Sequence, residues 1–375
     1  MIYLDFAATT PMSEKALLAY TEAAKQAFGN ASSLHDIGGK AHEWLNACRV
    51  TLANIIGGKK EGVIFTSGGT ESNILAIQTI LNSVSPNKKH IVSTRLEHSS
   101  IKNYLEALEK KGYEISYIQV DHHGRVLVNS LLYSLREDTA LVIVQQGNSE
   151  IGTIQPIEEI GSLLKERNIY FHTDCVQTFG KLDINVQKIN ASTYAFSSHK
   201  IYGPKGVGAV YFNSEINWKK TIPNVSHEHG FRAGTVDVPG ICSFVTQAKD
   251  FYNQREHFYH HFIQLRKLFF HEVKKRSLNN ITFINDETNH QLPHIIGIIT
   301  NQVEGQYLML ELNRKGFAVS TGSACQIGKQ APSETLLSIG FSKEQAFQFI
   351  RVSFGIHTTK EEIRKFVSTL HDLLT

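Results

Sequence analysis

Seven short runs rich in β-branched and aromatic residues recur between residues 13 and 245, and amphipathic helical segments separate them. Glycine or asparagine lies near the end of the helical segments 72–84, 100–112 and 157–168, as is common where helices stop. The alternation predicts an α/β domain with a mostly parallel, seven-stranded sheet covered by helices. The predicted strands are residues 62–67, 90–95, 114–120, 140–146, 169–174, 193–198 and 208–212.

A different pattern begins at Pro239. A long, charged and aromatic helical stretch runs to about residue 276, and shorter runs of both kinds follow it. Single cores usually stop growing at about 250 to 300 residues, and this chain has 375. We therefore expect a large domain over residues 13–245 and a smaller α+β domain made of residues 1–12 and 246–375. The later runs are strand-like at 280–285, 294–300 and 318–322 and helical at 304–316, 343–350 and 360–374.

Charge and hydropathy restrict the classes of partner. The 38 basic and 35 acidic residues are scattered and give a net charge of +3, so the sequence makes no electrostatic case for nucleic acid or an anionic membrane. The chain has no apolar stretch of about 18 residues, and its N-terminus is acidic at Asp5, where a signal peptide would be basic. The expectation is a cytoplasmic protein without a membrane partner.

The four cysteines are far apart and form no C-x-x-C pair, so neither a disulfide framework nor a thiolate zinc site is expected. Cys48, Cys175 and Cys242 lie in helical or apolar segments, which favours small buried hydrophobes. Cys325 differs, because the segment 320–328 around it is mostly glycine, serine, alanine and other small or polar residues. Such surroundings predict an exposed, mobile nucleophile.

Lys200 lies in the glycine-rich segment 197–208, between two predicted strands. Glycines let the backbone approach a ligand, and a partly desolvated lysine at a strand end suits a Schiff base. Taken alone, the segment leaves open an ordinary solvated lysine in a hairpin.

Three further features point to a cofactor with a phosphate group. Asp174 ends an apolar strand, where a carboxylate could keep a pyridine nitrogen protonated, although a helix N-cap is the plain alternative. The loop 66–73 offers glycine backbone and the Thr70 hydroxyl to an anion, or else forms a capping turn. His98 could stack on a flat ring and move protons, or be structural.

In their order along the chain, these segments resemble the NifS/IscS-type cysteine desulfurases, a branch of the fold-type I pyridoxal-phosphate enzymes in the class-V aminotransferase superfamily. The resemblance begins at residues 3–11, includes 28–35 and extends past 351–355. Single glycine loops match by chance, but an ordered set does not. The resemblance implies a fold-type I transferase that removes sulfur from L-cysteine, forms L-alanine and leaves a persulfide on Cys325. The sulfur would pass to an acceptor protein for iron-sulfur cluster or other sulfur-containing cofactor biosynthesis.

The resemblance also implies roles for individual residues. Cys325, Lys200 and His98 are the predicted catalytic residues, and no metal site is expected. Thr235 matches a threonine that reaches the phosphate across a dimer interface, which implies a homodimer. The other predicted contacts to pyridoxal 5'-phosphate are Asp174 at the pyridine nitrogen, Gln177 at the ring 3-oxygen, and Gly69, Thr70, Ser197 and His199 at the phosphate; Asn30 and Arg351 would grip the substrate carboxylate.

Two departures from the family pattern affect these predictions. The family usually has two adjacent asparagines before a glutamate, and here the pair is Asn148 and Ser149, so either residue is a candidate for the cofactor contact. Housekeeping relatives carry an extra C-terminal stretch that docks an iron-sulfur scaffold, whereas this chain ends at Thr375. A different sulfur acceptor is therefore expected.

Other functions stay open at this stage. The same cofactor could serve an aminotransferase, a kynureninase-like enzyme or a selenocysteine lyase, although aminotransferases need no mobile thiol. A non-catalytic sulfur-relay module could keep the fold. His257 and His261 have helical spacing that could bind a metal, but we interpret them as the polar face of the long helix.

Overall fold

The computed structural model describes residues 1–220, 222, 224–284, 290–322 and 332–375. Its largest sheet has seven strands in the order β2-β8-β7-β6-β5-β3-β4. Neighbouring strands are parallel except at β8, which is antiparallel to both β2 and β7. The predicted α/β fold with a mostly parallel seven-stranded sheet is confirmed. The strands are β2 (Val63–Thr66), β3 (His90–Ser93), β4 (Glu114–Tyr117), β5 (Thr139–Ile143), β6 (Tyr170–Asp174), β7 (Thr193–Ser197) and β8 (Gly208–Phe212).

Helices cover both faces of this sheet because successive side chains of a strand point to opposite sides. Ile91 of β3 packs with α3 and α4 in one apolar cluster, whereas the next residue, Val92, belongs to the cluster on the other face, with α6. The buried strands therefore read as nearly continuous apolar runs. The helices of this part are α3 (Gly69–Ser83), α4 (Ser99–Glu109), α5 (Val128–Ser134), α6 (Ile157–Glu166) and α7 (Val186–Ile189).

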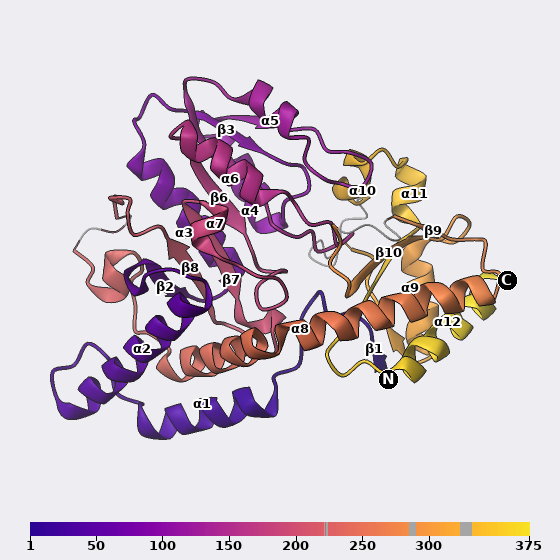
Figure 1. Cartoon of the computed structure of the whole chain (residues 1–375), viewed down its shortest axis with the longest axis horizontal. Coiled ribbons are helices and arrows are strands. Elements are labelled where there is room, and N and C mark those ends of the chain that lie inside the picture. Colours follow the sequence, from indigo (N-terminus) through magenta and orange to yellow (C-terminus); the bar gives the residue numbers. More distant parts are fainter. Residues whose placement is uncertain (221, 223, 285–289, 323–331) are drawn as a thin grey trace.

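A 38-residue helix, α8 (Val238–Lys275), connects the two parts of the molecule (Figure 1). Its first half packs on α1 (Glu14–Gln26) and α2 (Asp36–Ile55). Phe251 lies in the core of the large sheet, Phe262 in a second core, and Phe258 packs against both. At 1.5 Å per residue, α8 is about 57 Å long, enough to run along both cores.

The second core is built on a small antiparallel sheet, β12-β10-β9. The N-terminal segment joins it, because Leu4 is fully buried in this core and β1 pairs with β11. The division into a large domain over residues 13–245 and a small domain of residues 1–12 and 246–375 stays a prediction. The elements are β1 (Ile2–Tyr3), β9 (Thr282–Phe283), β10 (Ile295–Ile299), α9 (Gly305–Arg314), β11 (Phe317–Ala318), α10 (Glu334–Ser338), α11 (Lys343–Phe347), β12 (Phe349–Ser353) and α12 (Lys360–Leu374).

The prediction of a helix over residues 343–350 is wrong at its C-terminal end. The helix α11 stops at Phe347, and residues 349–353 form the strand β12. In β12, Phe349 pairs with Ile299 and Ile350 pairs with Ile298, and all four side chains are buried. Tertiary pairing in a core therefore overrides the local helical pattern.

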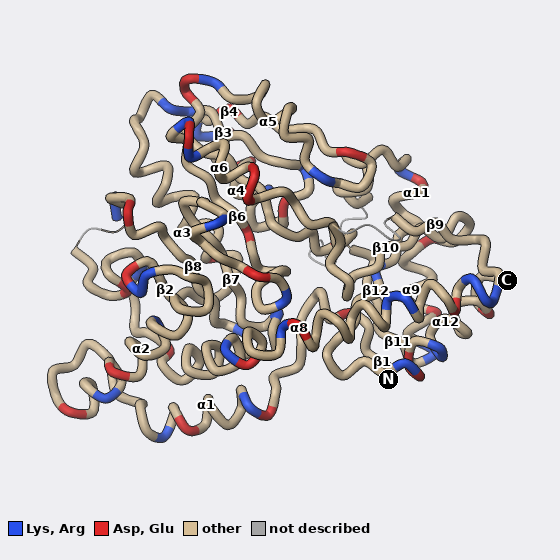
Figure 2. The backbone as a smooth tube through the Cα atoms, in the orientation of Figure 1, with Lys and Arg blue, Asp and Glu red and all other residues tan. Residues whose placement is uncertain are grey.

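Figure 2 shows lysine and arginine interspersed with aspartate and glutamate along the whole backbone. Among the residues that the structure describes, no helix is both long enough and apolar enough to cross a bilayer.

Candidate active site

A pocket of about 340 Å³ lies at the carboxyl ends of the parallel strands. Asp174 is the last residue of β6 and Ser197 the last of β7, and both line the pocket. Open α/β sheets bind their ligands at this edge. Most of the predicted site residues meet here: Gly69, Thr70, His98, Ser149, Asp174, Gln177, Ser197, His199, Lys200 and Arg351 all line the pocket.

Lys200 lies directly after β7, in the short 3-10 turn η2 (Ser198–Lys200). Its Nζ donates hydrogen bonds to the carbonyl oxygens of Ala7 and Ala8, at 2.7 Å each. Gln177 donates to the same Ala7 carbonyl from its Nε2, at 2.8 Å. The N-terminal segment therefore holds the amine at the pocket wall through backbone carbonyls.

Asp174 is held in place by a buried hydrogen-bond network. Its Oδ1 accepts from the Val176 backbone N–H and its Oδ2 from Asn73 Nδ2, each at 2.8 Å. Burial lowers the pKa of His172 to about 3, so this ring is neutral. Its Nε2 lies 3.0 Å from Asn73 Oδ1, an oxygen that can only accept, so Nε2 carries the proton. Asn73 is thus oriented by His172 and in turn orients Asp174.

His98 occupies the N-cap of α4, and its orientation follows from the backbone. Its Nδ1 accepts from the Ser100 backbone N–H at 3.2 Å, so the neutral ring carries its proton on Nε2. Burial is the largest cause of the lowered pKa of His98, which favours that neutral form. Asn73 Nδ2 also donates to Ser100 Oγ at 3.0 Å, so one asparagine connects Asp174 with His98.

The start of α3 forms a cradle for an anion. The helix begins at Gly69, and its N-cap, Gly68, has no side chain to bond the first backbone N–H groups. The nearby Ser197 hydroxyl is buried without a partner among the described atoms. A Cβ on Gly69 would lie 2.8 Å from Val176 Cγ2, so only glycine fits this close approach. An anionic ligand would satisfy both sets of unused donors.

His199 stands beside this cradle. Its Nδ1 lies 3.0 Å from the Thr9 hydroxyl. Burial, helped by the charge of Lys200, lowers the pKa of His199 to about 4. The ring is therefore neutral, so it would meet an anion as a hydrogen-bonding group.

Arg351 comes from β12 in the second core and forms the opposite wall. Its Nη1 donates to the Ser149 carbonyl oxygen at 2.8 Å, and its Nη2 pairs with Asp5 Oδ1 at 2.5 Å. Its Nε is buried without a partner in the described part of the chain. The Nε–H of the guanidinium is therefore unused, as expected of a group that awaits a ligand.

Asn148 and Ser149 have different positions. The Asn148 side chain is buried, donates from Nδ2 to the Leu96 carbonyl at 3.1 Å and accepts at Oδ1 from the Glu150 backbone N–H at 2.8 Å. It does not line the pocket, whereas Ser149 does. Of the two candidates, Ser149 is the one that a ligand in this pocket could contact.

Besides Asn148, two predicted residues of the described part of the chain lie outside this pocket. Asn30 is exposed between α1 and α2, and its Oδ1 accepts from the Ser32 backbone N–H. Thr235 is exposed in the loop before α8 and does not line the pocket. Cys325 lies outside the described residues. Gly322 and Pro332, on either side of that gap, both line the pocket.

Sequence reasoning missed several residues of the site. Asn73 was interpreted only as part of a capping turn, although it lies one helical turn after Gly69 and so on the same face of α3. Glu97 was passed over in favour of its neighbour His98. It is only 3% exposed, its Oε2 has no partner among the described atoms, and burial raises its pKa to about 8. The available signal was a carboxylate that follows a predicted strand and directly precedes the predicted site residue His98.

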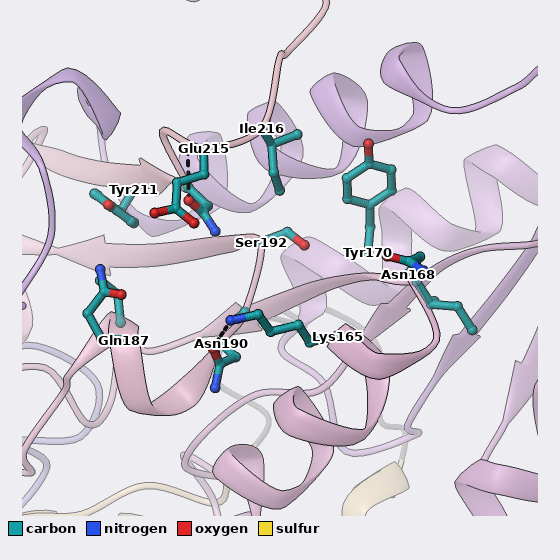
Figure 3. Close-up of a pocket in the computed structure, with 13 residues that line it drawn as sticks. Lys165, Asn168, Tyr170, Gln187, Asn190, Ser192, Tyr211, Glu215 and Ile216 are labelled. Atoms are coloured by element: carbon teal, nitrogen blue, oxygen red, sulfur yellow. Dashed lines mark hydrogen bonds between the residues drawn. The ribbon is translucent and has the colours of Figure 1, made fainter.

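A second pocket, of about 330 Å³, lies at the other end of the same strands. Tyr170 begins β6 and Ser192 precedes β7, and Lys165 donates to Asn190 Oδ1 at 2.9 Å (Figure 3). None of the predicted site residues lines it. The described residues also contain no group of three or more metal-ligating side chains. The site is therefore assigned to the first pocket.

Comparison with known proteins agrees with this geometry. Residues 2–366 match the aminotransferase class-V family. The chain is 47% identical over 370 residues to a NifS protein of Bacillus subtilis (strain 168), covering 98% of this chain and 93% of that one. It is 38% identical to the cysteine desulfurase IscS of Dictyoglomus turgidum, covering 100% and 94%. A solved NifS-like protein superposes with a TM-score of 0.92 at 27% identity, covering 100% and 99%. The chain therefore belongs to the aminotransferase class-V family and, within it, to the NifS/IscS-type cysteine desulfurases.

Proposed function

We propose that the pocket at Lys200 binds pyridoxal 5'-phosphate and L-cysteine, and that the substrate sulfur is transferred to Cys325 as L-alanine is released. The observation that carries this proposal is the meeting of Lys200, Asp174 and the uncapped start of α3 in one pocket. A solved structure titled "SspA in complex with cysteine", 28% identical with a TM-score of 0.81, supports cysteine as the substrate.

The residues present fit this cofactor. The first N–H groups of α3, Thr70, the unpartnered Ser197 hydroxyl and the neutral His199 would hold the phosphate. Asp174 would pair with the pyridine nitrogen, since its carboxylate is already fixed by Asn73 and Val176. Gln177 would reach the ring 3-oxygen, His98 would contact the ring, and Ser149 is our choice for the further contact.

When bound, pyridoxal phosphate supplies an electron sink for negative charge that develops on the substrate carbons. Lys200 is our candidate for the base that takes the proton from the substrate Cα. His98 carries its proton on Nε2, so it serves as a donor on the pocket side. Arg351 would bind the substrate carboxylate through its unused Nε–H.

The sulfur step needs no external reductant. The Cys325 thiolate attacks the sulfur of the substrate, a sulfur-sulfur bond forms, and the Cβ–S bond breaks. The electron pair of that bond stays on Cβ, which then takes a proton and becomes the methyl group of alanine. The persulfide on Cys325 passes to an acceptor protein, in our proposal one that builds iron-sulfur clusters or another sulfur-containing cofactor in the cytoplasm.

We further propose that the enzyme acts as a homodimer. Thr235 and Asn30 are both exposed on the single chain, so a second copy would be needed to bring either into a pocket. Exposed apolar side chains in α1 and in the loop after it support such an interface, because Leu18 is 71% and Phe28 67% exposed.

The decisive experiment replaces Cys325 by alanine. Cys325→Ala should abolish release of alanine and sulfide from cysteine, because the attacking thiolate is gone, while the absorbance of the bound cofactor stays unchanged. Full activity in this variant would overturn the assignment of Cys325. A parallel assay with selenocysteine separates a desulfurase, which turns over cysteine, from a selenocysteine lyase, which releases only selenide.

A further inference from the structure

Two cysteines that the sequence leaves unconnected meet outside the active site. Cys48 in α2 and Cys242 in α8 are 194 residues apart in the chain, yet their sulfur atoms lie 3.5 Å apart. Cys48 is half-buried and Cys242 is 7% exposed. Neither residue lines the candidate active site. The prediction that each is only a small buried hydrophobe therefore leaves out their contact.

The contact gives the two thiols different acidities. The Cys48 thiol donates a hydrogen bond to the Cys242 sulfur, which lowers the pKa of Cys242 and raises that of Cys48. A lowered pKa favours the thiolate, which is the form that oxidants attack. Cys175 provides the contrast, because it is 0% exposed and burial raises its pKa above the ordinary range.

We propose that Cys48 and Cys242 are the site of a reversible disulfide formed by a hydroperoxide. The Cys242 thiolate attacks one peroxide oxygen, the O–O bond breaks, and a sulfenic acid forms. The Cys48 sulfur then attacks the sulfenic sulfur and expels its oxygen as water. In total the two thiols lose two electrons and two protons. Hydrogen peroxide is reduced to two molecules of water, and an alkyl hydroperoxide is reduced to one alcohol and one water. A dithiol reverses the reaction.

The two sulfur atoms are already in contact. They must approach from 3.5 Å to the bonded distance of about 2.05 Å. The helices that carry them pack against each other, which keeps the two thiols together.

The disulfide would brace a segment that matters for the site. Next to Cys48, Arg49 forms a buried pair with Glu228 at 2.8 Å, and Glu228 also accepts from the Phe65 backbone N–H at 2.7 Å. Thr235 lies midway between Glu228 and Cys242 in the sequence. The segment 228–242 is held at its first end by the pair of Glu228 with Arg49. A bond between Cys48 and Cys242 would hold it at its second end as well. Disulfide formation does not depend on the proposed function, and only the role of Thr235 rests on it.

Peptide mapping of the purified holoenzyme tests the proposal. After treatment with hydrogen peroxide, alkylation and trypsin, we expect peptides 41–49 and 233–249 to appear cross-linked, and dithiothreitol to restore both thiols. Peptide 168–181, which contains Cys175, should keep an alkylatable thiol and serves as the internal control. Non-reducing electrophoresis should show no added mass, because the bond lies within one chain.

Two variants make the result specific. Cys48→Ser and Cys242→Ser should each abolish the cross-link and leave the activity of the reduced enzyme unchanged. Oxidation should raise the unfolding temperature of the wild type by several degrees and leave that of either variant unshifted. Repeating the mapping in Cys325→Ser removes competition from that thiol and separates this proposal from the proposed function. The proposal is overturned if both thiols stay alkylatable after peroxide treatment, or if either one pairs with Cys325 or with a second chain.

Discussion

Two charged residues on opposite sides of the pocket, Asp174 and Arg351, differ in how completely their polar atoms are bonded. On the sheet side, both oxygens of Asp174 accept hydrogen bonds, and Asn73 is fixed by His172. On the opposite side, Arg351 keeps one buried N–H without a described partner. A fully bonded network is rigid and suits a resident cofactor, whereas an unused donor suits a substrate that arrives and leaves. The comparison predicts that changes on the two sides will alter different kinetic constants.

The largest effect is expected at Lys200. Lys200→Ala removes the amine that the Ala7 and Ala8 carbonyls hold in place, so the rate of alanine formation should fall by about 10²–10⁴-fold or more. Single-turnover assays of alanine, with the absorbance of bound cofactor, measure the loss. Lys205→Ala is the matched control, since Lys205 is exposed on the same glycine-rich segment. Equal losses in the two variants would contradict the role of Lys200.

Arg351→Lys tests the substrate side. Lysine keeps the positive charge but loses the planar donor set, so the KM for cysteine should rise by about 10–100-fold with a smaller change in kcat. Steady-state kinetics separates the two constants. Asp5→Asn weakens the pair with Arg351 but leaves the arginine in place, and it should change KM much less. A similar rise in KM in both variants would show that Arg351 acts mainly through Asp5.

Asn73→Leu tests the network on the sheet side. The substitution keeps the volume but removes the donor to Asp174 Oδ2 and to Ser100 Oγ. The Kd of the apoprotein for pyridoxal phosphate should therefore rise by about tenfold. Titration of the apoprotein followed by absorbance measures this affinity. Ser100→Ala is the comparison, because it removes only the branch to His98. Ser100→Ala should shift the pH profile of kcat and leave the Kd for pyridoxal phosphate unchanged. A Kd that rises as much as in Asn73→Leu would show that the hydrogen bonds of Asn73 to Asp174 and to Ser100 do not act separately.

The smallest effect on activity is expected at Glu97, and it concerns stability. Burial raises the pKa of Glu97 to about 8, so the folded state holds a proton that the unfolded chain releases above pH 4.5. Stability is therefore lost as pH rises from about 4.5 to 8. Glu97→Gln stays neutral and still accepts from Thr94 and the Gln145 backbone. Its stability relative to wild type should rise by up to about 1.4 kcal/mol per pH unit in that window, measured by urea unfolding. A pH-independent difference would rule out this protonated carboxyl.

Much of the sheet and of the cofactor side could be predicted from the sequence because the relevant signals are local. Each of the seven strands is a short run with its own turn signals, and Asp174 and Ser197 stand at the ends of such runs. The carboxyl ends of parallel strands meet at one edge, so predicting the strands already placed these residues together. The incorrect helix over 343–350 shows the limit, because a partner strand in the second core converted its end into β12.

The sequence by itself determined the alternating elements, the strand-end positions of Lys200 and Asp174, and the family. Only the tertiary structure decided that Asn73 lies between His172 and Asp174, about 100 residues away, and that Cys48 meets Cys242 across two helices. The reason is physical. Periodicity and turn chemistry act over a few residues, whereas a hydrogen bond or a thiol contact depends on positions set by the packing of the whole core.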